Sequence, residues 1–145
     1  MKLIKRGMKI MLGEKIGSCT ATSTNKALSC HDGVLPSFET AAQGSGTIAG
    51  VEVTMMSTYT ADMRADGSLQ GECPNAGVVM AQDGVATFSA TGTGNFTDEG
   101  GNHFVGAAYF QASAPSLSSL NGKCVVFEWD VTADGAATWE LWEWK

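Results

Sequence analysis

Three side chains in the sequence carry groups that are suited to acid–base chemistry. Glu128 lies in the middle of an apolar run, Tyr59 lies in a long stretch of alternating polarity, and His103 follows the Gly100-Gly101 step. A carboxyl group that points into apolar surroundings holds its proton more tightly, and histidine titrates near neutral pH. The alternative is that Glu128 is a solubilising charge and His103 a surface residue beside a turn. The three residues are therefore candidates for polarising a substrate, with both readings open.

A second set of residues is suited to binding an apolar molecule. All four tryptophans fall within the last 17 residues, and they form part of a wider concentration of aromatic side chains near the C-terminus. Ligand pockets are mostly apolar with few polar groups, but an aromatic cluster equally well fills a core. The residues expected to wall such a pocket are Met55, Tyr59, Tyr109, Trp129 and Trp142.

Motifs for nucleotide, metal and serine chemistry are missing from the sequence. The spacing Gly44-x-Gly46-x-x-x-Gly50 differs from the dinucleotide fingerprint and precedes a strand, so it indicates a kink or bulge. No serine stands in a GxSxG elbow. The four cysteines have no CxxC spacing, and Cys30-His31 is the one adjacent cysteine–histidine pair. The sequence therefore predicts no metal, no cofactor and reduced thiols, with a Cys19–Cys30 bridge as the alternative for an exported protein.

The charge distribution excludes one class of partner. The formal net charge is −6, and from residue 27 onward three basic residues face fourteen acidic ones. Such a surface repels a phosphate backbone, so no nucleic-acid partner is expected.

Residues 1–14 form a basic leader, which we interpret as a disordered tail or as the result of a misassigned start, since Met8 and Met11 are alternative initiators. Residues 15–145 are expected to form a single domain. The leader holds no apolar run of the ~7–15 residues that a signal peptide needs, and no segment approaches the ~20 apolar residues of a membrane span. We therefore expect a cytoplasmic protein without a membrane partner.

The elements that position these residues are predicted to be β-strands. The steps Asp66-Gly67, Asp83-Gly84, Gly100-Gly101 and Asp134-Gly135 are typical of tight hairpin turns. Residues 115–122 begin with proline and end with glycine, as a short helical turn does. The expected strands cover residues 16–24, 38–48, 51–63, 68–82 with a break at 73–75, 85–97, 102–114, 123–131 and 136–144.

Eight strands joined by short turns predict an antiparallel up-and-down barrel, with a two-sheet β-sandwich as the alternative. A barrel of eight strands is filled by side chains or holds one small ligand. Trp139 and Leu141 on an uncovered face would form an apolar patch suited to a homodimer. Both a monomer and a homodimer are compatible with the sequence.

The sequence resembles a group of small uncharacterised bacterial proteins over residues 44–145. The matching segments are Gly44–Val53, Ala65–Glu72, Ala86–Phe88, Gly92–Thr97, Ala108–Gln111, Leu120–Gly122, Val126–Trp129 and Leu141–Lys145. More distantly, the strand rhythm and a Gly-Thr-Gly turn are similar to the eight-stranded barrels of the allene-oxide-cyclase type. The first resemblance implies an all-β domain without an assigned activity, and the second implies a cofactor-independent enzyme.

Three hypotheses about function follow. The first is a barrel that binds a small apolar ligand in its interior. The second is a cyclase or isomerase in which Glu128, Tyr59 or His103 polarises a substrate that the pocket folds into a reactive shape. The third is a filled barrel that serves as a structural or oligomer-forming module. Whether the protein is an enzyme is not decided by the sequence.

Overall fold

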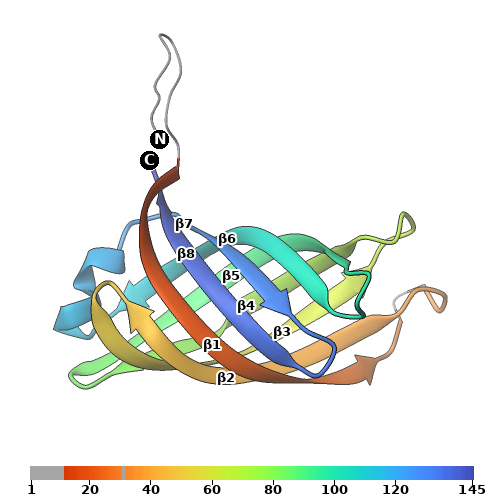
Figure 1. The fold of residues 1–145 in the computed structure, drawn as a ribbon, viewed down its shortest axis with the longest axis horizontal. Coiled ribbons are helices and arrows are strands. Elements are labelled where there is room, and N and C mark those ends of the chain that lie inside the picture. Colours follow the sequence, from red (N-terminus) through yellow and green to blue (C-terminus); the bar gives the residue numbers. More distant parts are fainter. Residues whose placement is uncertain (1–11, 31) are drawn as a thin grey trace, which may run out of the picture.

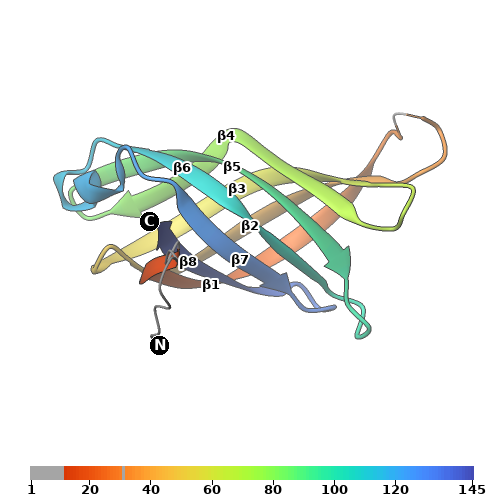
Figure 2. The same cartoon turned by 90° about the horizontal axis from the view of Figure 1, so that it is seen from above.

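The computed structural model describes residues 12–30 and 32–145, and these form a closed antiparallel barrel (Figures 1 and 2). Each strand pairs with its neighbour in the sequence, and β1 pairs with β8 to close the ring. The predicted up-and-down barrel is confirmed, and the alternative of a β-sandwich is wrong. The strands are β1 (Leu12–Leu28), β2 (Ser37–Ile48), β3 (Val51–Met63), β4 (Leu69–Ala81), β5 (Gly84–Phe96), β6 (Asn102–Ala112), β7 (Val125–Val131) and β8 (Ala136–Trp144).

Strands β2, β5, β6 and β7 differ from their expected bounds by one or two residues, and β1 and β4 differ further. The first strand continues to Leu28, four residues past its expected end. The first strand begins at Leu12 and therefore includes residues 12–14 of the expected leader, whose residues 1–11 lie outside the described part of the chain. The expected break at residues 73–75 is a bulge inside β4 rather than a strand end. Pro74 lacks an N–H and Asn75 has a φ of 57°, so the ladder is interrupted there and resumes at Gly77.

Alternation assigns one face of every strand to the barrel interior. On β3, Val53, Met55 and Ala61 are buried, whereas Glu52 and Thr54 are exposed. The same alternation places inward residues of β7 and β8 in the core.

Trp139 and Leu141 are among these inward residues and are 4 % and 0 % exposed. The expectation that these two residues form an apolar patch on an uncovered face is therefore wrong. Since they point inward, they give no support to a homodimer.

The two ends of the barrel differ. The 3₁₀ helix η1 (Pro115–Leu120) lies at one end of the barrel, which we call the helix end (Figure 1). It buries Leu117 and Leu120. Asp83 in the β4–β5 turn accepts hydrogen bonds from the backbone N–H and hydroxyl of Ser116, at 2.9 and 2.7 Å, and so pins the helix to this end. At the open end lie residues 29–30 and 32–36 of the first loop, together with the loops of residues 64–68, 97–101 and 132–135. Within the described ranges, no helix has the length and apolar character needed to cross a membrane.

Glycines allow β1 and β2 to approach closely. A Cβ built on Gly46 would lie 2.1 Å from the carbonyl oxygen of Ser18 and 2.6 Å from the Cα of Cys19. Gly44 faces similar contacts with Thr20 and Ala21. Because the blocking atoms belong to the backbone, they cannot move aside without distorting β1. The glycine spacing noted in the sequence therefore serves strand packing.

We predict that Gly46→Ala lowers the free energy of unfolding by about 1–3 kcal/mol, because the added methyl group overpacks the β1–β2 contact. Ser45→Ala is the matched control, since Ser45 is exposed on the opposite face of the same strand. Urea unfolding of the two variants measures the difference. Equal stabilities for both variants would contradict the packing role assigned to Gly46.

Candidate functional site

Three of the five residues expected to wall a pocket lie inside the barrel. Met55 on β3 and Trp129 on β7 are buried, and Tyr59 on β3 packs against the same interior cluster. Tyr109 and Trp142 lie on the outer face, which corrects their expected place. Tyr109 is 51 % exposed because its neighbours Ala108 and Phe110 take the inward positions of β6. Trp142 alternates with inward Leu141, and the ammonium of Lys15 lies 5.6 Å from the centre of its ring.

Two of the three acid–base candidates point outward, in agreement with the alternative in which Glu128 is a solubilising charge and His103 a surface residue beside a turn. Glu128 is exposed on β7, between Phe127 and Trp129, which take the inward positions. His103 lies on the outer face of β6, where its Nδ1 is 2.5 Å from Oδ1 of Asp130. Of the three candidates, Tyr59 is the one that borders the interior.

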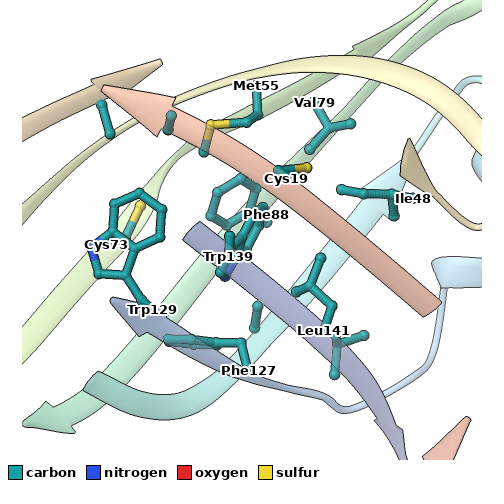
Figure 3. Close-up of a cluster of buried hydrophobic side chains, with 14 of the residues drawn as sticks. Cys19, Ile48, Met55, Cys73, Val79, Phe88, Phe127, Trp129, Trp139 and Leu141 are labelled. Atoms are coloured by element: carbon teal, nitrogen blue, oxygen red, sulfur yellow. The ribbon is translucent and has the colours of Figure 1, made fainter. Parts of the chain in front are cut away.

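The interior contains a small chamber with apolar walls, which we call the inner chamber. Figure 3 shows several of its lining side chains within the buried cluster, among them Met55, Phe88 and Trp129. Its volume is about 60 Å³. Around Trp139 the rings of Phe88, Phe110 and Phe127 pack with centroid distances of 5.1, 6.3 and 6.4 Å. The chamber is lined by Met55, Ser57, Tyr59, Gly71, Glu72, Cys73, Phe88, Ala90, Thr91, Gly92, Phe104, Phe127, Trp129 and Trp139.

A chain of hydrogen bonds crosses the interior beside this chamber. The indole Nε1–H of Trp129 donates to the hydroxyl oxygen of Tyr59 at 2.9 Å. The Tyr59 side chain is also hydrogen-bonded to Thr40, its register partner on β2. The hydroxyl of Thr40 donates to Oδ1 of Asn25 at 2.7 Å. Polar groups of β7, β3, β2 and β1 are thus linked from the middle of the barrel toward the open end.

A second cavity of about 60 Å³, which we call the vestibule, lies on the other side of Tyr59 and Phe104. These two residues line both cavities, and their rings pack edge to face at 6.1 Å. The vestibule is more polar than the inner chamber, since it includes Asn25, Thr40 and Asn102. The Oδ1 atom of Asn102 is buried and has no hydrogen-bond donor. Its remaining lining residues are Phe38, Ala61, Leu69 and Phe96.

Burial changes the ionisation of groups that face the interior. It raises the pKa of the Tyr59 hydroxyl, against the opposing effect of the hydrogen bonds that this hydroxyl makes with Trp129 and Thr40. Burial likewise raises the pKa of Cys73, whose thiol lines the inner chamber. The Tyr59 hydroxyl and the Cys73 thiol therefore stay neutral at pH 7.

The cysteines and acidic groups offer no metal centre in residues 12–30 and 32–145. No group of three or more His, Cys, Asp or Glu side chains is close enough there to hold an ion. Cys19, Cys30, Cys73 and Cys124 are all free thiols, so the alternative of a Cys19–Cys30 bridge is not observed. His31, the neighbour of Cys30, lies outside the described residues.

Sequence reasoning missed several residues of the site. Phe88, Phe104 and Cys73 line the inner chamber, and Thr40 and Asn102 line the vestibule. The alternation of β5 is a usable signal for Phe88, whereas both faces of β6 are apolar and leave Phe104 ambiguous. No local signal identified Thr40 or Asn102, because their role depends on which strands face each other across the barrel.

We predict that Tyr59→Phe lowers the free energy of unfolding by about 1–3 kcal/mol, because it leaves the buried Nε1–H of Trp129 without an acceptor. Tyr109→Phe is the matched control, since the exposed Tyr109 hydroxyl should change stability by less than about 0.5 kcal/mol. Chemical unfolding of both variants measures the difference. If both substitutions lower the free energy of unfolding by the same amount, the hydrogen bond from Trp129 to Tyr59 does not stabilise the fold as predicted.

We also predict that stability falls as the pH rises from 9 toward 11. Burial, and secondly the charge of Glu140, raises the pKa of Cys19 from 9.0 to about 11, so the folded protein keeps a proton that the unfolded chain loses. Cys19→Ala should reduce this fall, and Cys30→Ala should leave it unchanged, as measured by unfolding at several pH values under reducing conditions. An identical pH dependence in Cys19→Ala and the unsubstituted protein would contradict the assignment.

The comparisons with known proteins support the barrel fold but assign neither a family nor a function. No family model and no curated protein matches the chain, and the resemblance to allene-oxide-cyclase-type barrels is not shown. A conserved protein of unknown function from Rhodopseudomonas palustris is similar in structure, with a TM-score of 0.76 at 12% identity over 94% of this chain and 100% of that one. A protein of unknown function from Clostridium acetobutylicum has a TM-score of 0.78 at 13% identity, over 96% of this chain and 100% of that one. A β-barrel-like protein from Acinetobacter baumannii has a TM-score of 0.75 at 11% identity, over 97% of this chain and 100% of that one. The chain therefore shares its barrel with uncharacterised proteins.

Proposed function

We propose that this protein binds a small apolar molecule inside its barrel. The observation that carries the proposal is the inner chamber, whose wall combines aromatic rings with the Met55 thioether and the Cys73 thiol. Walls of this composition bind apolar molecules by removing them from water, and a preformed wall limits the cost of ordering side chains.

The volume of the chamber limits the size of the ligand. A volume of about 60 Å³ has room for roughly four to six water-sized groups, and pockets for drug-sized ligands measure ~300–1,000 Å³. The expected ligand is therefore a molecule of a few non-hydrogen atoms. A larger molecule would enter if Tyr59 and Phe104 moved, because these side chains separate the chamber from the vestibule.

Binding is favoured over catalysis by the placement of the acid–base candidates. Glu128 and His103 lie on the outer face, and Tyr59 alone of the three borders the chamber. Its hydroxyl is engaged by Trp129 and Thr40, and its raised pKa disfavours the tyrosinate that a base would need. These three candidates would thus give a cyclase or isomerase little capacity for proton transfer. We place the binding function in the cytoplasm, where the four free thiols would remain reduced.

Dissolved xenon is the first probe, because it is small, apolar and enters dry cavities. The tryptophans provide an internal control: Trp129 and Trp139 line the chamber, whereas Trp142 and Trp144 lie outside it. In a ¹⁵N–¹H spectrum, we expect xenon to shift the two inner indole signals in a saturable manner and to leave the outer two almost unchanged.

A chamber-filling variant tests whether the shifts come from this site. Ala90 lines the chamber, and Ala90→Leu should abolish the saturable shift. Ala107→Leu, on the outer face of neighbouring β6, should preserve it. No response of the inner indoles in the unsubstituted protein would instead support a filled barrel with a structural role.

A further inference from the structure

Apolar side chains gather on the outer face of the barrel, on strands β6, β7 and β8 and at the start of β1. We call this surface the outer patch. Its three largest exposed members, Leu12, Tyr109 and Trp144, are each half-exposed. Contiguous exposed apolar surface marks an interaction site, whereas single exposed apolar residues do not. The outer patch consists of Leu12, Val105, Tyr109, Val126, Trp142 and Trp144.

The strand register joins these side chains into one surface. Val126 of β7 pairs with Trp142 of β8 and with Ala107 of β6. Val105 and Tyr109 lie on either side of Ala107, on the same outer face of β6. The apolar surface is therefore continuous from β6 across β7 to β8.

The outer patch ends where the chain enters the barrel. Leu12 is the first described residue, and it pairs with Trp144 at the end of β8. Residues 1–11 are joined directly to it. An extended chain of that length spans about 36 Å, and the distance from β1 to β6 across β8 and β7 is about 15 Å. The covalent link also gives these residues an effective concentration of about a millimolar at the patch, so a weak contact is sufficient.

The composition of residues 1–11 is complementary to this surface. None of these residues is acidic, and apart from Gly7 every residue that is not basic is apolar. The apolar side chains match the exposed rings and aliphatic groups of the outer patch. The basic residues are Lys2, Lys5, Arg6 and Lys9.

Acidic side chains border the outer patch on β7 and β8. Glu128 pairs with Val105 on one side and with Glu140 on the other, so two carboxylates face each other across neighbouring strands. Like charges in this position repel each other. Lys15 forms an ion pair with Glu140 at 2.5 Å, but Glu128 forms none with a described residue. A basic segment on the patch would therefore neutralise Glu128.

We propose that residues 1–11 bind the outer patch of their own chain. Their apolar side chains cover the exposed aromatic rings, and their basic side chains face Glu128. The contact removes apolar surface from water, and the ionic part fixes where the segment lies. This inference is independent of the proposed ligand, because the outer patch and the inner chamber lie on opposite faces of the barrel wall.

Nuclear Overhauser contacts between methyl groups and aromatic rings test the proposal in the full-length protein. Ile4 and Ile10 belong to residues 1–11, and we expect cross-peaks from their methyl groups to the ring of Trp144 or Tyr109. Ile48 is the internal control, because it is buried in the core and should give no cross-peak to either exposed ring. If Ile4 and Ile10 contact neither ring, the proposal is wrong.

Charge reversal tests the ionic part of the contact. Glu128→Lys should lower the equilibrium constant for docking roughly two- to fivefold, the range expected for one exposed ion pair. The Trp144 indole signal should then move toward its position in about 0.5 M NaCl, where such pairs are screened. Glu52→Lys is the matched control, since Glu52 is exposed on β3, which pairs with none of the strands of the patch. Equal responses of the two variants would overturn the assignment of Glu128.

Dilution determines whether the patch is covered by its own chain or by a second copy. Binding within one chain predicts that the cross-peaks and the Trp144 signal do not change with protein concentration, and that sedimentation shows a monomer. Cross-peaks that disappear on dilution together with a dimer would refute the proposal and assign the outer patch to a second copy. The xenon experiment probes the other face of the wall, so its outcome leaves this test unaffected.

Discussion

The pairing of β1 with β8 is the constraint on which the rest of the structure depends. It leaves no free edge in the ring and assigns one face of every strand to the interior. The register shifts near Lys15 adjust β1 to its partner at the helix end. Once the ring is closed, side chains as distant in sequence as Tyr59 and Trp129 face each other, and their hydrogen bond across the interior becomes geometrically available.

Side chains fill the interior of the barrel unevenly, and this leaves room for the inner chamber and the vestibule. Tryptophan and phenylalanine side chains crowd the middle of the barrel, while glycine, alanine and cysteine occupy facing positions on β4 and β5. The helix end is covered by η1, but the open end is bordered by loops and a partly polar vestibule. Tyr59 and Phe104 lie between the vestibule and the inner chamber.

The sequence predicted the architecture well and the site only in part. Turn dipeptides and strand alternation are local signals, so they identified the barrel, the bounds of β3 and the inward side of that strand. On β6 both faces are apolar, which is why Tyr109 was placed inside although it is exposed. Glu128 and His103 were ambiguous for a similar reason, since alternation gives two faces but does not say which one is covered. The contacts of Thr40 and Asn102 depend on closure of the ring, and no local pattern records them.

The most direct test of a ligand-binding barrel is native mass spectrometry of the protein purified from its natural cells, compared with its denatured mass. The account predicts a native mass that exceeds a whole number of bare chains by one small molecule per barrel, with the excess lost on denaturation. The mass of the released molecule would limit which compounds the ligand can be. A native mass equal to that of bare chains, from freshly prepared and concentrated protein, would contradict the account and identify the barrel as a filled structural module.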